Sequence, residues 1–285
     1  DLGNDFAPHT TLKGLFITNA TTAAPALTPV QTLTVPAYTI PINPPQPGNL
    51  TTLDDGDTRF SAATRVVNGV LYAVHNVEVN TRAALRWYRV NATNFNVIES
   101  GTITDPVLDL FYPSIAANAT GTIVIGCNGC SATNFISAYA CVGATTNGVT
   151  AFNSPLLLKA GTVSYEVLVG TDTTSRWGDY SATSPDPADP NRFWTIQMIP
   201  VGAQTWRTQI TEIITGAPAL SLSLMSGNAT LSWPAYAATM QLQGNPSAVN
   251  TSTWSTLANA PITNGNQLTV TLPASAPAQF FRLRQ

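Results

Sequence analysis

The sequence predicts an all-β protein of two domains, and three observations favour this fold class. Only 9% of the 285 residues are charged, against about 25% in an average soluble protein, so the long charged side chains that usually cover helices are scarce. Thr and Val take their place and favour strands. Short apolar runs separated by turn residues also recur along the chain, which is typical of β-sheet domains.

The amino-terminal part is expected to run along the surface of the sheets. Residues 14–18 predict a strand. Seven prolines then lie between Pro25 and Pro47. Because proline cannot donate to a sheet ladder, we expect this stretch to follow a surface or a sheet edge. The run Asp54-Asp55-Gly56-Asp57 predicts a tight turn after it.

A regular series of short strands follows, and it predicts β-propeller blades. Asn68-Gly69 is a strong two-residue hairpin signal. Groups of about four strands recur every 45 to 55 residues or so, a spacing typical of blades. Three groups enter a strand through a similar corner, at residues 57–61, 112–115 and 177–181. The predicted strands are 59–67, 69–77, 84–90, 96–103, 114–117, 122–127, 135–142, 156–158, 177–183, 193–199 and 205–213.

These patterns divide the chain into a propeller segment of about four blades over residues 1–215, a linker at 216–219, and a small sandwich over 220–285. The sandwich is expected to be of immunoglobulin or fibronectin III type, because short alternating strands follow one another closely. Trp233 and Trp254 are its expected core aromatics. Its predicted strands are 220–224, 229–233, 238–243, 254–257, 268–272 and 279–283.

Several short motifs carry a family resemblance. They are Gln46-Pro47-Gly48, Asp57-Thr58-Arg59, Asn68-Gly69-Val70-Leu71-Tyr72, Arg86-Trp87-Tyr88, Phe111-Tyr112-Pro113-Ser114-Ile115-Ala116 and the stretch Arg176–Trp194. With them, the segment from Asp54 to Ile213 resembles a family of secreted bacterial β-propeller proteins of uncharacterised function, distantly similar to sialidase-like (BNR-repeat) propellers. The tail, with Leu231-Ser232-Trp233-Pro234-Ala235 and Gln279-Phe280-Phe281-Arg282-Leu283-Arg284, resembles carboxy-terminal sandwich domains of bacterial exported proteins.

The chain departs from this family in two ways. Closed propellers usually need 6 or 7 blades or so, more than the roughly four predicted here. Residues 13–19 read like the middle of a blade, so we expect either that an amino-terminal part is lost or that another chain completes the ring. The sialidase Asp box (Ser-x-Asp-x-Gly-x-Thr-Trp) is not found intact, which weakens the transfer of a catalytic role.

The charged and aromatic stretch around Arg176 is the main candidate site. Arg176, Trp177, Asp179 and Tyr180 predict a binding surface or a hydrogen-bonded corner. Arg86 and Trp87 are further binding candidates. Sialidase-like chemistry, implied by the resemblance alone, would draw on Arg176, Asp179 and Tyr180, with Arg59, Asp57, Tyr165 and Glu166. Tyr165 and Glu166 are adjacent in a predicted β segment, so their side chains are expected on opposite faces.

Calcium is the one cofactor for which the sequence offers ligands. Asp54, Asp55 and Asp57 could bind it through carboxylates and turn carbonyls, and Asp186 and Asp189 form a second acidic turn. A calcium site needs about six oxygens, and the second group alternates Asp with Pro, which suits a rigid turn equally well.

The three cysteines, Cys127, Cys130 and Cys141, predict one disulfide within a hairpin, in an oxidising compartment, with the pairing left open. A zinc site lacks a fourth ligand nearby. Six N-x-[ST] sequons are glycosylation candidates, although a chain rich in Asn and Thr produces about as many by chance. They begin at Asn19, Asn49, Asn91, Asn118, Asn228 and Asn250.

Charge and hydropathy restrict the partners. A net charge of −3 gives no electrostatic reason to bind nucleic acid, and no apolar run reaches the roughly 20 residues of a membrane span. The first residue is Asp1, so we expect a processed or truncated product from which any signal peptide is gone. The low-charge, Thr/Asn-rich composition favours a secreted, extracellular or cell-surface location.

These observations together predict a non-enzymatic structural or adhesive protein. It would self-associate, as a filament or with a companion chain that completes the propeller, or bind glycans through the propeller surface. Unpaired strand edges are templates for another chain, and the Pro25–Pro47 stretch could cover an edge or be donated to a neighbour. A sialidase-like glycoside hydrolase and a glycan-binding module of a larger processed protein remain the alternatives.

Overall fold

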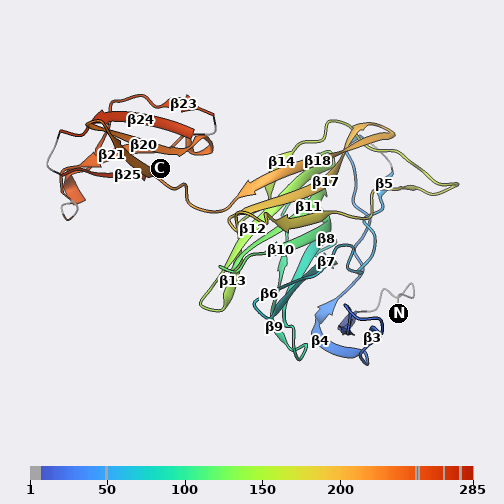
Figure 1. Ribbon diagram of the computed structural model, residues 1–285. Helices are drawn as coiled ribbons and strands as arrows, with labels where there is room; N and C mark the ends of the chain where they lie inside the picture. The colour runs from blue at the N-terminus through green and yellow to red at the C-terminus, as the bar shows by residue number, and fades with distance from the viewer. Residues whose placement is uncertain are drawn as a thin grey trace. The chain divides into compact units, whose positions relative to one another are not determined.

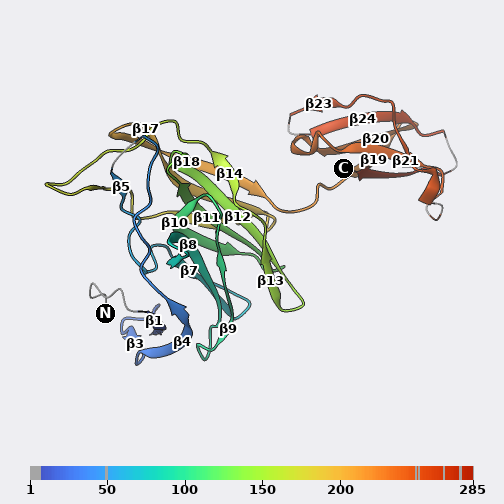
Figure 2. The ribbon, with the colours of Figure 1, turned by 180° about the vertical axis from the view of Figure 1, so that it is seen from behind.

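The computed structural model describes residues 8–48, 51–247, 249, 251–265, 267–275 and 278–284. The chain forms two compact units, Asp1–Thr215 and Gly216–Gln285. Within the described residues every element is a β-strand, apart from two three-residue 3₁₀ turns at Ala235–Ala237 and Thr251–Thr253. The all-β prediction is therefore confirmed (Figures 1 and 2).

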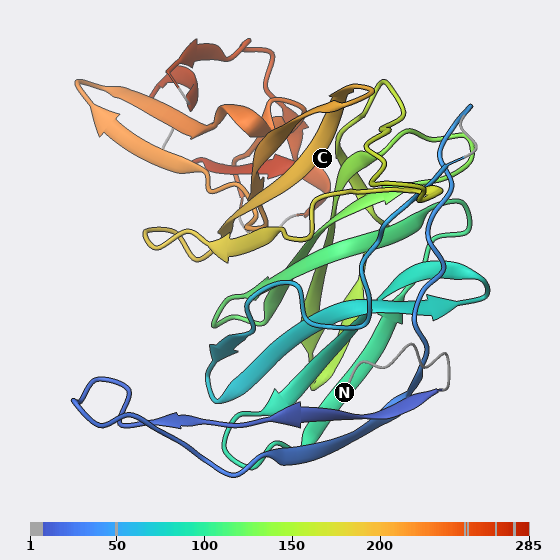
Figure 3. The same cartoon turned by 90° about the vertical axis from the view of Figure 1, so that its right-hand side faces the viewer.

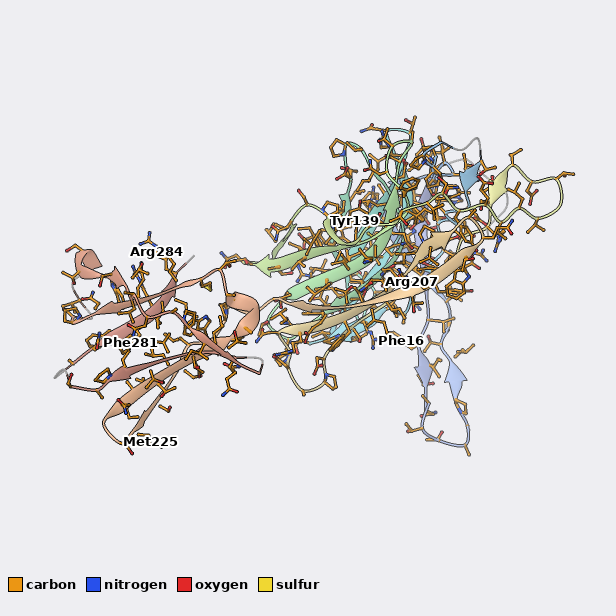
Figure 4. The ribbon with its side chains drawn as sticks, turned by 90° about the horizontal axis from the view of Figure 1, so that it is seen from above. Phe16, Tyr139, Arg207, Met225, Phe281 and Arg284 are labelled. Atoms are coloured by element: carbon orange, nitrogen blue, oxygen red, sulfur yellow. The ribbon has the colours of Figure 1, made fainter. Side chains whose placement is uncertain are left out.

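Unit 1 begins with a long two-stranded hairpin. Strand β1 (His9–Gly14) pairs with β4 (Gln31–Tyr38), and the short strands β2 (Ile17–Thr18) and β3 (Ala26–Leu27) form its tip. The tip beyond Phe16 projects away from the sheets (Figure 4), while the Phe16 ring lies 4.5 Å from that of Phe95. Strand β4 lies at a sheet edge, where its proline, Pro36, is tolerated.

Three antiparallel sheets follow in chain order, each built from strands that are consecutive in sequence. The first holds β6 (Arg65–Val67), β7 (Val70–Val79), β8 (Arg82–Asn91) and β9 (Val97–Ile103). The second holds β10 (Asp109–Ala117), β11 (Thr122–Cys130), β12 (Ser137–Thr146), β13 (Val149–Phe152) and β14 (Leu156–Lys159). The third holds β16 (Ala182–Pro185), β17 (Arg192–Gly202) and β18 (Thr205–Ile214).

The hairpin and the three sheets lie one upon another, face to face (Figure 3). Leu33 and Tyr88 belong to the core cluster between the hairpin and the first sheet. Leu85 and Ile125 belong to the cluster between the first and second sheets, and Phe193 packs between the second and third. Strand β10 is buried along its whole length, as expected for a strand with apolar neighbours on both faces. The sheets of the described chain form no closed propeller.

Two predicted strand segments are loops. Strand β6 begins only at Arg65, and β16 only at Ala182, so residues 59–64 and 177–181 are not strands. The Asp57 side chain instead accepts a hydrogen bond from the Arg59 amide, at 2.7 Å, and such local bonds compete with a sheet ladder. Strand β13 was not predicted, because its four residues are short and carry no strong signal.

The disulfide prediction is wrong. Cys127, Cys130 and Cys141 are all free and buried. Cys127 and Cys130 both lie on β11, three residues apart, so their side chains point to opposite faces and cannot bridge. Cys127 and Cys141 share the cluster between the first two sheets, and the Cys130 thiol donates to the Pro45 carbonyl at 3.3 Å. The cysteines therefore fill the core and give no support for an oxidising compartment.

Unit 2 consists of two antiparallel sheets around one apolar core. One sheet has the order β19 (Ser221–Met225), β20 (Asn228–Pro234), β24 (Gln267–Pro273), β23 (Ile262–Asn264), and the other has β22 (Ser255–Thr256), β21 (Gln241–Asn245), β25 (Phe280–Arg284). Met225 lies at the end of β19 in this unit (Figure 4). Trp233 is in the core at 1% exposure, as predicted. Trp254 is not in the core cluster, because it is half-buried under the Arg282 guanidinium, 4.3 Å from its ring.

Candidate functional site

A short parallel pair of strands brings two distant loops of unit 1 together. Strand β5 (Thr52–Leu53) pairs in parallel with β15 (Thr174–Ser175). Parallel strands leave a sheet at the same end, so the residues that follow them emerge side by side. The Asp54 amide donates to the Ser175 carbonyl at 2.9 Å, and the Arg176 guanidinium contacts the Asp54 carboxylate at 2.6 Å. The loops that begin at Asp54 and Arg176 therefore form one site.

These loops surround a pocket of about 390 Å³, within the usual range for small-molecule sites. All three recurring corners of the sequence contribute to it: residues 57–61, Tyr112 from the second sheet, and residues 179–180. The pocket is lined by Asp54, Asp55, Gly56, Asp57, Arg59, Phe60, Ser61, Asn76, Tyr112, Arg176, Asp179 and Tyr180. Seven of these were site candidates from sequence: Asp54, Asp55, Asp57, Arg59, Arg176, Asp179 and Tyr180.

Both arginines of the pocket are already paired with carboxylates. Arg59 contacts Asp57 through Nε and Nη2, each at 2.6 Å from Oδ2. Arg176 contacts Asp54 at 2.6 Å and Asp179 at 3.5 Å. The guanidinium groups are more than half exposed, so these ion pairs add little to stability. Their main effect is to neutralise the positive charge on the rim of the pocket.

The backbone at Tyr112 adopts a conformation that is uncommon for an aromatic residue. Tyr112 has a φ of +47° and lies where the register of β10 and β11 shifts between Phe111 and Ser114. This bulge turns the Tyr112 side chain toward the pocket, where its hydroxyl donates to Asp179 at 3.4 Å. Left-handed backbone at a bulky residue costs free energy and is often kept at functional sites.

Gly56 is required beneath this tyrosine. Its φ of +79° suits glycine, and a Cβ there would lie 3.0 Å from the Tyr112 ring. Burial, above all, raises the pKa of the Tyr112 hydroxyl, and the nearby Asp54 and Asp179 raise it further. Tyr112 therefore remains a neutral hydrogen-bond donor at physiological pH.

Strand β7 holds the acidic loop in place through two buried side chains. His75 Nδ1 donates to the Thr58 carbonyl at 2.6 Å, so Nε2 of the neutral ring accepts from the Tyr88 hydroxyl at 3.0 Å. Burial lowers the pKa of His75 to about 4, which keeps the ring neutral. Asn76 Nδ2 donates to the Asp55 carbonyl at 2.7 Å. His75 is therefore a structural residue rather than a base.

Asp55 is the unusual residue of the site. Its side chain is fully buried at 0% exposure, yet neither carboxylate oxygen accepts a hydrogen bond from another residue. The Oδ1 atom of Asn76, at 3% exposure, is also buried without a partner. Burial raises the pKa of Asp55 well above its ordinary value, and the neighbouring Asp54, Asp109 and Asp57 add to this effect. Buried acceptors of this kind normally have a partner.

The structure places the remaining site candidates outside the pocket lining. Trp177 is buried, donates to Asn128 Oδ1 at 3.2 Å and packs edge-on against Tyr165. Trp87 lies in the core between the first two sheets, and Arg86 donates to the Thr102 hydroxyl at 2.5 Å. Tyr165 is buried and Glu166 is exposed, so they face opposite ways, although residues 160–173 form no strand and the predicted β segment is wrong.

The calcium expectation does not match the geometry. Within the described chain, no three His, Cys, Asp or Glu side chains come close enough to hold a metal ion. Asp54 Oδ1 instead accepts from the Gly56 amide, and Asp57 turns toward Arg59. In the second acidic turn, Asp186 caps two amides and accepts from the Trp194 indole. These carboxylates are engaged in local hydrogen bonds and do not converge on a common point.

The sequons lie in different surroundings. Asn19 and Asn228 are exposed. Asn91 accepts hydrogen bonds from two amides of the turn after β8. Asn118 is buried and donates to the Pro190 carbonyl, so its amide nitrogen is not free for a glycan. Asn49 and Asn250 lie outside the described residues.

Sequence reasoning did not identify Asn76, Tyr112, Phe60 and Ser61 as site residues. A signal for three of them was present, because Tyr112, Phe60 and Ser61 lie in the recurring corners. These corners recur in the sequence and meet at the pocket, so the repeat itself could have indicated the site. Asn76 gives no such signal, because nothing in the sequence pattern distinguishes it from other asparagines in alternating strands.

No protein-family model and no curated protein matches the chain. None of the helical segments described in the structure is long and apolar enough to cross a membrane. The fold class and the pocket therefore define the protein as an all-β chain with an acidic, hydroxyl- and amide-lined pocket.

Proposed function

We propose that unit 1 is an open, propeller-like stack of sheets that binds a carbohydrate without cleaving it, at the cell surface or outside the cell. Three consecutive sheets of neighbouring strands, and the convergence of the three corners on one pocket, support the propeller-like arrangement. Seven strands among the described residues of unit 2, in two antiparallel sheets around Trp233, support a sandwich of immunoglobulin or fibronectin III type. The low-charge composition supports the extracellular location.

The observation that carries the binding proposal is the polar lining of the pocket, which is built from carboxylate, guanidinium, hydroxyl and amide residues. Asp54, Asp179 and Ser61 have partly exposed side chains in this lining, and their oxygen atoms can accept hydrogen bonds from sugar hydroxyls. Tyr180, 76% exposed, and Phe60 add aromatic rings at the rim, on which a sugar ring can stack. A polar pocket with few apolar walls suits a polyhydroxylated ligand better than a lipid or an aromatic one.

The paired arginines favour binding over sialidase-like hydrolysis. A sialidase-like site needs free guanidinium groups for a carboxylate, whereas Arg59 and Arg176 are each occupied by aspartates. Hydrolysis is the alternative function, and the experiment below distinguishes it from binding.

A glycan array followed by calorimetry tests the proposal. We expect the wild-type protein to bind at least one class of glycan, and Tyr180→Ala to weaken that binding about tenfold through loss of stacking. Leu27→Ala is the matched control, because it truncates a similarly exposed side chain outside the pocket. Absence of binding across the array would refute the proposal. Release of new reducing ends from the bound glycan, abolished by Asp179→Asn, would show hydrolysis instead.

Self-association is a second candidate function, favoured by the outer face of the third sheet. Trp194, Trp206 and Ile210 are 38%, 52% and 60% exposed, and strand pairing places Ile210 opposite Ile196 on that face. The other sheets of unit 1 pack face to face through apolar residues of the same kind. We therefore propose a second copy of this chain as the occupant of this face.

A further inference from the structure

A second pocket, of about 320 Å³, lies where the first and second sheets of unit 1 meet. One side of it consists of residues from Gly101 to Thr104, at the end of β9. The other side consists of residues between Thr150 and Pro155, at the end of β13 and just beyond it. The pocket shares no lining residue with the pocket around Arg176, so it is a separate site.

The lining of this second pocket carries no charge. None of its residues is ionisable. Arg86 and Glu99 bond to the hydroxyls of Thr102 and Thr150, but neither lines the pocket. An ionised ligand would lose hydration on entry without gaining a counter-charge from the lining. The pocket therefore suits an uncharged ligand.

The indole N–H of Trp87 is an unused donor in this pocket. Trp87 is only 5% exposed, and its Nε1 donates to no residue of the described chain, although buried indole N–H groups usually have a partner. Nε1 lies over Gly101, where an added Cβ would be 3.0 Å from it. The Nε1 of Trp233 is buried without a partner, whereas solvent reaches that of Trp87. Because Trp87 and Gly101 both line the pocket, this donor opens into it.

Apolar and polar side chains accompany this donor. The Phe152 ring lies 5.5 Å from the Trp87 ring, and Phe152 and Pro155 are partly exposed in the lining. Three exposed hydroxyl or amide side chains of the lining make no hydrogen bond among the described residues: Thr104, Asn153 and Ser154. The pocket thus offers one fixed N–H donor beside an apolar wall, and free polar groups that can bond to ligand hydroxyls.

We infer that this second pocket binds an N-acetylated sugar, whose acetamido carbonyl accepts from Trp87 Nε1 and whose methyl group packs against Phe152. An acetamido group is uncharged and joins a hydrogen-bond acceptor to an apolar methyl, which matches a donor beside an aromatic wall. The ring hydroxyls supply the partners for the free polar groups of the lining. The inference assigns a site of its own and does not depend on binding at the pocket around Arg176.

Three β-1,4-linked trisaccharides test the inference on the wild-type protein. They consist of N-acetylglucosamine, glucosamine or glucose, and so carry an acetamido group, an ammonium group or a hydroxyl at the same ring position. Two-dimensional NMR of isotope-labelled protein separates the indole N–H groups of the six tryptophans, and the Trp87 signal is assigned through its Overhauser contacts with Gly101. We expect the acetylated trisaccharide to shift this signal and to bind at least about tenfold more tightly there than the other two.

Variants then test the individual contacts. Trp87→Phe keeps an aromatic ring, removes the N–H donor and should abolish the preference for the acetylated trisaccharide. Asn153→Ala, at an exposed position, should weaken binding about threefold or more through loss of a hydrogen bond. Asn96→Ala makes the same change at an exposed position outside both pockets and should have no effect. The ligand comparison uses the wild-type protein, so it holds even if Trp87→Phe does not fold.

The outcomes separate this site from the pocket of the proposed function. Equal shifts of the Trp87 signal with all three trisaccharides, or a shift with an acetyl-lysine peptide alone, would overturn the inference of an acetylated sugar. Glycan binding that leaves the Trp87 signal unmoved and is weakened by Tyr180→Ala would refute the second site and support the proposed function. A Trp87 shift that persists in Tyr180→Ala, with no other glycan binding, would support the second site and count against the first.

Discussion

At the scale of single residues, burial determines the pKa of the Asp55 carboxyl group. The carboxyl group lies at 0% exposure beside the acceptor-rich turn of Asp54 and Asp57, and no side chain of opposite charge contacts it among the described residues. Burial raises the pKa of this group well above its ordinary value of 3.8. Arg176 and Arg59 stay at the rim and neutralise the more exposed aspartates instead.

The raised pKa of Asp55 predicts a pH-dependent stability. A carboxyl group with a higher pKa in the folded state binds its proton more tightly there, so its contribution is largest at low pH and is lost as the pH rises through the folded pKa. In urea unfolding between about pH 4 and pH 8, we expect wild-type stability to fall relative to Asp55→Asn, by about 1.4 kcal/mol per unit of pKa elevation. Asp172→Asn is the control and should follow the wild type. Parallel profiles for wild type and Asp55→Asn would contradict the prediction.

At the scale of elements, the second and third sheets approach each other closely at Gly126. A Cβ at this position of β11 would lie 2.0 Å from Thr195 Oγ1 and 2.6 Å from Gln197 Nε2. Thr195 also bonds to Thr183, whose hydroxyl contacts Ser114 at 2.8 Å across the two sheets. A buried hydroxyl network therefore joins the sheets where no side chain can intervene.

This close approach predicts that Gly126→Ala destabilises unit 1. The added methyl group has to displace Thr195 and the hydroxyl network, and we expect the free energy of unfolding to fall by about 1–3 kcal/mol. Gly202→Ala is the control, because a Cβ there comes no closer than 3.4 Å to Thr205. Denaturant unfolding of both variants measures the difference, and equal stability of the two would argue against the close contact.

At the scale of the whole molecule, the stack of sheets in unit 1 is open. The outer face of the third sheet exposes Trp194, Trp206 and Ile210, although its inner face is packed through Phe193. With a net charge of −3 over 285 residues, repulsion between copies is small. Large exposed apolar patches mark interaction sites on soluble proteins, and this is the basis for the proposed self-association.

We therefore expect the protein to self-associate at rising concentration, as measured by sedimentation or light scattering. The double variant Trp206→Ser/Ile210→Ser should shift the equilibrium toward the monomer by more than about tenfold, because it removes apolar area from the face. Leu27→Ser, in the hairpin tip, removes a similarly exposed side chain and should leave association unchanged. An identical distribution of species in all three proteins would rule out this face.

Much of unit 1 could be predicted because its signals are local. Asn68 and Gly69 both have positive φ, at +49° and +75°, as the hairpin signal requires, and β6 and β7 lie on either side of this turn. The alternation of apolar residues predicted the bounds of most other strands to within a few residues. The loops at 59–64 and 177–181 were misread, because their aromatic and β-branched residues suit a strand while their side-chain hydrogen bonds prevent one.

The pocket was predicted only in part. Asp54, Arg176 and Asp179 stood out as charged residues in a chain with few charges. Their meeting depends on the parallel pairing of β5 with β15, across more than a hundred residues, and no local pattern encodes such a contact. The same holds for Trp177, whose aromatic character indicated a binding surface although the fold buries it against Tyr165.

The sequence by itself determined the all-β class, the strand spacing and the scarcity of charge, because composition and alternation act within a few residues. Only the tertiary structure decided that Cys127, Cys130 and Cys141 stay unbonded, that carboxylates of the acidic turns pair with arginine and backbone amides, and that Asp55 is buried. Each of these depends on which faces and loops meet, and burial and pairing are properties of the folded chain.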